Sequence, residues 1–223
     1  MRDAPLRSNI MKQYTYGFSL VELLAVIAAT AIMAGLLIPI IGCGGSGKVN
    51  MDAALVQTVA NGANLYKAIF ASEMDNIVLG KESASWPQSG QYSSSTEYFV
   101  NLVKTGVINV TYDFFAAPGI PPAKSSNASD FTSNNNAWRL VLGLDKAEEG
   151  TPFLFTRNYD PGAIQGGDDD IVLSGQPFGD YAMVVVLKGG SAFSLRGNNQ
   201  LKNSYFNPAG SPPTDANISI VGP

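Results

Sequence analysis

Several residue types on which enzymes and metal sites depend are absent or scarce in this chain of 223 residues. It contains no histidine, which removes the commonest general base and a frequent metal ligand. Its single cysteine, Cys43, excludes an intrachain disulfide and any paired-cysteine motif. No Gly-x-Ser-x-Gly nucleophile motif occurs. These absences predict a protein that is not an enzyme.

Charged residues are also few, at 14% of the chain. The chain has 14 Lys and Arg and 18 Asp and Glu, of which three basic and two acidic residues lie up to position 41. The rest of the chain therefore has a net charge of −5. A nucleic-acid-binding surface needs a basic patch for the phosphate backbone. The charge balance therefore argues against a nucleic-acid partner.

The chain does contain one long apolar run, which starts with the sequence GFSLVE at residues 17–22 and continues to Ile41. As a helix, residues 18–41 span roughly 36 Å, enough to cross a bilayer core of about 30 Å. Glu22 is the only charged residue inside the run. A carboxylate costs about 2.5–3.5 kcal/mol at the bilayer centre, and less near an interface. The pattern indicates a membrane helix whose carboxylate later pairs with a positive group on a neighbouring copy.

The residues GFSLVELLAVIAATAIMAGLLIPI resemble the N-terminal cleavage and methylation motif of type IV pilins and type II secretion pseudopilins. The resemblance implies cleavage by prepilin peptidase after Gly17, methylation of the new N-terminal Phe18, and a role for Glu22 in filament assembly. It also implies an α+β fold, in which a long N-terminal helix, half transmembrane and half amphipathic, packs on a small antiparallel β-sheet. The implied partners are copies of the chain or other pilin-like subunits, the peptidase, the membrane and an inner-membrane assembly platform.

The charges around the run give its orientation. Arg2, Arg7 and Lys12 precede it, and the first basic residue after it is Lys48. The positive-inside tendency places the N-terminus in the cytoplasm. With the resemblance, this predicts a single-pass protein of the bacterial inner membrane that then enters a periplasmic or extracellular filament. Met11 is an alternative start, since residues 11–17 look like a short basic leader.

Two further motifs near the end of the run offer other interpretations. Residues 40–43 resemble a lipobox, a motif in which a signal peptide is cut before a cysteine, here Cys43, that is then lipid-modified. Residues 42–48 spell the start of a phosphate-binding P-loop, but Val49 stands where the motif needs Ser or Thr for magnesium. We interpret the glycines instead as a helix break. The predicted organisation is a leader at 1–17, a membrane and assembly helix at 18–41, a glycine-rich hinge at 42–49 and an extracytoplasmic pilin-like domain at 50–223.

The outer domain shows a helical apolar stripe over Asn50 to about Asp75, made of Leu55, Val56, Val59, Leu65, Tyr66, Ile69 and Phe70. We predict that the outer domain packs on this stripe. A capping box at Ser94 and Glu97 predicts a second helix that ends at Gly106. We predict strands at 107–112, 153–156, 181–187 and 191–195, the last two joined by a turn at 189–190. Residues 118–136 are predicted to be a surface loop, and 138–144 fit either a helix or a strand.

The acidic run Asp168, Asp169 and Asp170, between glycines and Ile171, is a candidate calcium site. Three neighbouring carboxylates repel one another, and a bound Ca²⁺ relieves that repulsion. Major pseudopilins carry calcium in a C-terminal loop, and Asp160 and Asp180 are candidate additional ligands. The spacing is not that of an EF-hand, so a solvated acidic loop is the alternative.

Two functions remain open on the sequence. The first is a structural subunit of a type IV-like filament. A type II secretion pseudopilin is favoured over a pilin, because the two-cysteine C-terminal loop frequent in type IV pilins is absent. The alternative is a membrane- or lipid-anchored extracytoplasmic binding protein.

Overall fold

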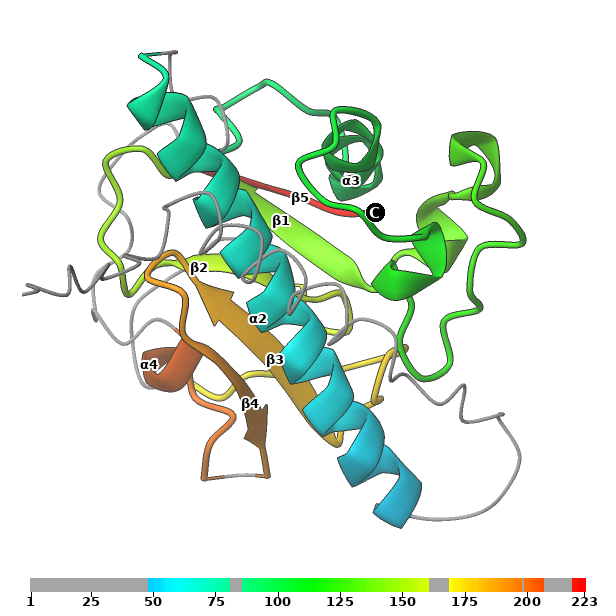
Figure 1. Ribbon diagram of the computed structural model, residues 1–223. Coiled ribbons are helices and arrows are strands. Elements are labelled where there is room, and N and C mark those ends of the chain that lie inside the picture. Colours follow the sequence, from blue (N-terminus) through cyan, green and yellow to red (C-terminus); the bar gives the residue numbers. More distant parts are fainter. Residues whose placement is uncertain (1–47, 81–85, 161–168, 198, 207–217) are drawn as a thin grey trace, which may run out of the picture. The chain divides into compact units, whose positions relative to one another are not determined.

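The computed structural model describes residues 48–80, 86–160, 169–197, 199–206 and 218–223 (Figure 1). These residues belong to one compact unit, which runs from Gly45 to Pro223. The predicted leader, the apolar run 18–41 and most of the glycine-rich hinge lie outside the described residues. Within the described part, no helix is both long enough and apolar enough to cross a membrane.

The longest element is helix α2, Lys48–Val78, which confirms the helix predicted over Asn50 to Asp75 and extends it at both ends. Its segment contains no proline, and Gly80 ends it with a φ of 64° and an amide that donates to the carbonyl of Ile77. Leu55, Leu65 and Ile69 are fully buried, as the apolar stripe predicted.

Five antiparallel strands form a single sheet in the order β4-β3-β2-β1-β5 (Figure 1). The strands are β1 Trp138–Leu142, β2 Pro152–Thr156, β3 Ala182–Leu187, β4 Ala192–Arg196 and β5 Ser219–Val221. One sheet with a long helix gives the α+β class expected from the sequence. The β2, β3 and β4 predictions are confirmed, and the ambiguous segment 138–144 contains a strand.

Helix α3, Ser95–Lys104, also matches the prediction, although its cap differs in one detail. The Ser94 hydroxyl accepts a bond from the Glu97 amide at 3.1 Å, whereas the Glu97 carboxylate reaches back to Ser93, not to Ser94. The bonds from Ser93 lower the pKa of Glu97, so this carboxylate stays ionised at the start of the helix.

The strand predicted at 107–112 is wrong. After Gly106, which has a φ of 75°, the chain forms turns and then the 3-10 helix η1, Tyr112–Phe115. The side chains of Ile108 and Tyr112 are each buried in the core. The alternation of apolar residues in this segment therefore reflects two separate buried side chains and not a strand paired in a sheet. Residues 118–136 are irregular as predicted, with the short 3-10 helices η2, Ala128–Asp130, and η3, Ser133–Asn135.

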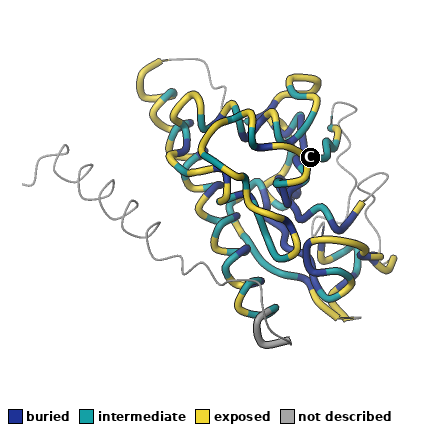
Figure 2. Tube along the Cα trace, turned by 90° about the vertical axis from the view of Figure 1, so that its right-hand side faces the viewer, coloured by how far each residue is buried: buried dark blue, intermediate teal, exposed yellow. Residues whose placement is uncertain are grey.

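One face of the sheet packs against α2, mainly through β3 and β4 (Figure 1). On this face Trp138 and Val186 lie directly beneath Gly62 of α2. On the opposite face Phe155 contacts Phe206 of the short helix α4, Asn203–Phe206, with ring centroids 5.1 Å apart. Buried residues gather in the strands, while exposed residues follow the loops and the outer side of α2 (Figure 2).

Candidate functional site

The residues predicted to carry processing and assembly, Gly17, Phe18 and Glu22, lie outside the described residues, as does Asp168. Their roles stay predictions from the sequence. The described structure shows three features that bear on function: the polar contact that holds the start of α2, the acidic segment before Ile171, and the outer face of α2.

The start of α2 is fixed to the β3–β4 hairpin by one carboxylate. Asp52 accepts a hydrogen bond from the hydroxyl of Tyr181 at 2.5 Å and from the guanidinium of Arg196 at 2.6 Å. Tyr181 lies just before β3 and Arg196 ends β4. Hydrogen bonding with Tyr181 and the charge of Asp52 raise the pKa of Arg196. The contact therefore holds the first turns of α2 to the β3–β4 hairpin.

A shallow, open hollow of about 390 Å³ lies beside this contact and is lined by Asp180, Tyr181, Arg196, Gly197 and Leu201. Sites for small molecules enclose most of their ligand within a cleft or cavity. The open shape of this hollow gives no such enclosure, so we assign it no ligand. It does place Asp180, one of the two candidate additional calcium ligands.

The acidic run has a protein cation beside it. The carboxylate of Asp170 forms an ion pair with the ammonium of Lys202. The backbone on either side is pinned, because the carbonyl of Asp169 accepts from the amide of Asn203 at 2.9 Å and the amide of Ile171 donates to the carbonyl of Leu201 at 2.7 Å. Lys202 thus offsets part of the repulsion that a bound calcium ion would relieve.

Asp160, the other candidate additional ligand, pairs with Arg139 at 3.2 Å. The pKa of the neighbouring Tyr159 is raised, mainly by burial and to a smaller extent by the charge of Asp160. Over the described ranges, which leave out Asp168, no three carboxylate or cysteine side chains are grouped so that they could hold a metal ion. The structure therefore does not bring Asp160 and Asp180 together with Asp169 and Asp170 into a metal-binding group.

The calcium prediction can be tested on a domain that starts at Gly45 and so keeps the whole of α2. If the acidic run binds calcium, the ion stabilises the folded form by RT ln(1 + [L]/Kd), about 2.7 kcal/mol at a hundredfold excess over Kd. Melting curves should then shift upwards with Ca²⁺ and return with a chelator. The double variant Asp168→Asn with Asp170→Asn should stay folded and lose the response. A wild-type curve indifferent to calcium identifies a solvated loop held by Lys202.

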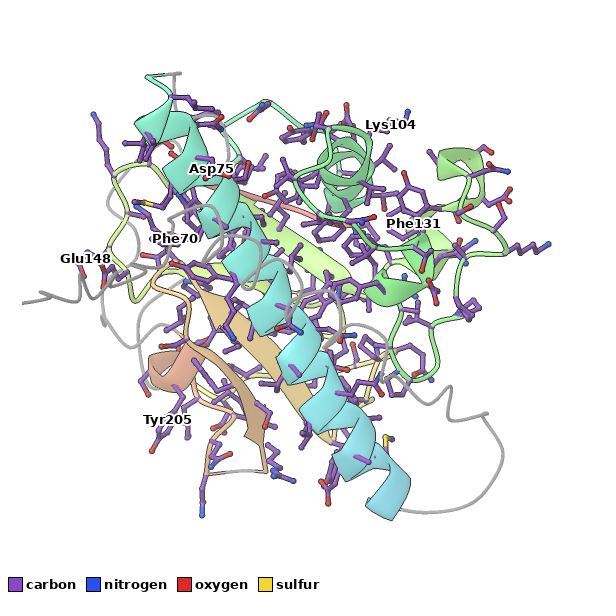
Figure 3. All side chains as sticks on the ribbon, in the orientation of Figure 1. Phe70, Asp75, Lys104, Phe131, Glu148 and Tyr205 are labelled. Carbon is purple, nitrogen blue, oxygen red and sulfur yellow. The ribbon has the colours of Figure 1, made fainter. Side chains whose placement is uncertain are left out.

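The outer face of α2 carries apolar side chains that its own domain does not cover. Phe70 is 46% exposed, Met74 45% and Ile77 56%, and Val56 in the first half of the helix is 67% exposed. Figure 3 shows Phe70 on α2, where its ring stacks on that of Tyr66 with centroids 5.9 Å apart. The sequence prediction that Val56 and Phe70 help to pack the domain on α2 is therefore wrong. Apolar residues spaced three and four apart fit two different stripes on the same helix. Only the stripe with Leu55, Leu65 and Ile69 is buried against the sheet.

No protein-family model, curated protein or solved structure matches this chain. Its function has to follow from its own residues.

Proposed function

We propose that this chain is a structural subunit of a type IV-like filament, most closely a type II secretion pseudopilin. The observation that carries the proposal is Glu22 in the apolar run 18–41, which begins directly after Gly17. A membrane anchor alone gains nothing from a charge that opposes insertion. In an assembled bundle the same carboxylate pairs with the amine of a neighbour's Phe18, which cleavage after Gly17 creates.

The described domain supports this proposal through its connection to the run. The glycine-rich hinge leads directly into α2, a helix of 31 residues that lies on a small antiparallel sheet. A long helix on such a sheet is what the resemblance implies for the outer part of a subunit. The contact of Asp52 with Tyr181 and Arg196 holds the start of that helix to the sheet.

The absence of a second cysteine bears on the choice between a pilin and a pseudopilin. Cys43 cannot form the disulfide-closed C-terminal loop that is frequent in type IV pilins. A pseudopilin needs no such loop, so this interpretation is favoured. The proposed location follows: the inner membrane before assembly, with the domain outside the cytoplasm, and then a filament built on an inner-membrane platform.

Processing provides the direct test. We expect the mature chain to begin at Phe18 with a methylated amine when its N-terminal peptide is measured by mass spectrometry. A Gly17→Trp variant, which puts a bulky side chain at the cut, should keep its leader, whereas a Ser19→Ala variant should be processed normally. A mature chain that starts at Cys43, or a wild-type chain with an intact leader, contradicts the proposal.

The alternative function, an anchored binding protein, predicts a different behaviour of intact cells. A filament subunit should leave the membrane on mechanical shear, without detergent, and sediment as a polymer. An anchored monomer should stay in the membrane fraction until detergent releases it. Recovery of all the protein in the membrane after shear therefore favours the alternative.

A further inference from the structure

The outer face of α2 has a regular repeat that extends over most of the helix. Its members are Val56, Ala60, Ala63, Lys67, Phe70, Met74 and Ile77, and the steps between them alternate between four and three residues. All seven are exposed or half-buried. This heptad spacing is the pattern of side chains that pack against a second helix. Lys67 is the only charged member, and it lies in the middle.

Side-chain size divides the repeat into two halves. The first, here the small half, consists of Val56, Ala60 and Ala63, and the second, the large half, of Phe70, Met74 and Ile77. The ring of Phe70 stacks on that of Tyr66 one turn earlier, with centroids 5.9 Å apart, and still leaves 46% of Phe70 exposed.

We infer that the large half of one subunit packs on the small half of the next copy of this chain, with the two α2 helices parallel and shifted by two heptads. This inference rests on the proposed filament function, because anchoring in one membrane gives all copies the same direction. The shift sets Phe70 beside the partner's Val56, Met74 beside the partner's Ala60 and Ile77 beside the partner's Ala63. Each large side chain then lies opposite a smaller one, as close packing of two helices requires.

Other registers fit less well. Without a shift, Lys67 meets its own copy and the two alanines face each other across a gap. A shift of one heptad sets Ala60 against Lys67 and Phe70 against Ile77, which pairs a small apolar group with a charge and two large groups with each other. The two-heptad shift moves Lys67 to the edge of the contact, opposite the partner's Ala53, and leaves the three large side chains each facing a smaller one. It predicts an axial offset of about 21 Å between the paired subunits.

The two halves are different surfaces, so the contact is heterologous. A heterologous contact leaves one half free at each end and continues from copy to copy, which builds a polymer rather than a closed dimer. Each half offers only three side chains, so the surface that it buries is far below the ~800 Å² per partner of a stable complex. The domain without residues 1–44 is therefore expected to be monomeric, and the contact adds to assembly that the N-terminal segments drive.

Cysteine cross-linking in the full-length chain tests the register. On a Cys43→Ser background, the pair Ala60→Cys with Met74→Cys should give a ladder of covalent dimers, trimers and larger species after oxidation of sheared filaments. Either single variant should give none, because like positions lie about 21 Å apart along the axis. The pair Ala60→Cys with Lys67→Cys is the control for a shift of one heptad. A ladder from the second pair alone, or from neither pair, overturns the inference.

A charge exchange keeps the inference testable if the cysteine pair does not assemble. Met74→Lys should reduce sedimentable filaments at least tenfold, and adding Ala60→Glu should restore them, whereas Ala71→Glu, elsewhere on the exposed surface of α2, should not. Failure of Ala60→Glu to restore assembly overturns the register. If the wild-type chain forms filaments but the pair Ala60→Cys with Met74→Cys gives no ladder in assembled filaments, only this contact is rejected. Absence of any wild-type filament rejects the proposed function and this inference with it.

Discussion

A Gly62→Val variant is expected to lower the free energy of unfolding of the domain by about 3 kcal/mol, the upper part of the range for overpacked cores. At Gly62, α2 lies close enough to the sheet that a side chain would overlap its neighbours. A Cβ atom there would lie 2.6 Å from Cγ2 of Val186 and 3.1 Å from the Trp138 ring. Both side chains are fully buried, so neither can move into solvent. Urea unfolding of the domain that starts at Gly45 measures the change, which corresponds to a melting temperature about 6–12 °C lower.

Two comparisons separate the destabilisation caused by this close contact from the effect of the substituted residue on helix propensity. Ala71→Val puts the same side chain on an exposed position of α2, where the propensity cost is below about 0.7 kcal/mol. Gly62→Ala should also destabilise, although alanine favours a helix by about 1 kcal/mol over glycine. In a Val186→Ala background, which removes the methyl group at 2.6 Å and leaves the Trp138 ring at 3.1 Å, the cost of Gly62→Ala should become smaller. A stabilising Gly62→Ala in the wild-type background would contradict the close approach.

Local signals in the sequence predicted much of this fold. The apolar spacing of Leu55, Leu65 and Ile69 located α2, and the cap at Ser94 located the start of α3. The turn at residues 189–190 joined two strands correctly, with Gly190 at a φ of 88°. These elements depend on neighbours within a few residues along the chain, and such interactions can be read from a single sequence.

The remaining elements depend on contacts between distant segments. Residues 107–112 have the composition of a strand but find no partner strand in the described part of the fold. The short strand β5 exists because it pairs with β1, some eighty residues earlier along the chain, and three residues carry too little pattern to reveal it. Segment 138–144 became a strand because β2 and β5 lie on its two sides.

The functional features divide in the same way. The motif at Gly17, Phe18 and Glu22 is contiguous, so the sequence alone indicates it. The contact of Asp52 with Arg196 joins residues 144 positions apart, and no local pattern announces it. The helical spacing grouped Val56 and Phe70 with the buried residues of α2, and only burial separates a stripe that packs on the sheet from one that faces outwards.

Replacing Glu22 by alanine is expected to leave the chain in the membrane and to abolish filaments. The change removes a charge that costs up to about 2.5–3.5 kcal/mol on insertion, so insertion should become easier. In the assembled bundle, however, the amine of a neighbour's Phe18 then lies buried without its partner. An uncompensated buried charge costs about 3–5 kcal/mol. At about 1.4 kcal/mol for each factor of ten, sedimentable filaments should fall more than a hundredfold.

The charge of residue 22, rather than its size, should decide the outcome. Glu22→Gln keeps the shape of the side chain without its charge and should fail to assemble, as alanine does. Glu22→Asp keeps the charge on a shorter side chain and should retain part of the assembly. Fractionation into membrane and sheared polymer, with the mature N-terminus checked by mass spectrometry, measures all three variants on equally processed chains. If Glu22→Gln assembles like the wild type, the carboxylate does not pair with Phe18, and the proposal that this chain is a filament subunit loses its main support.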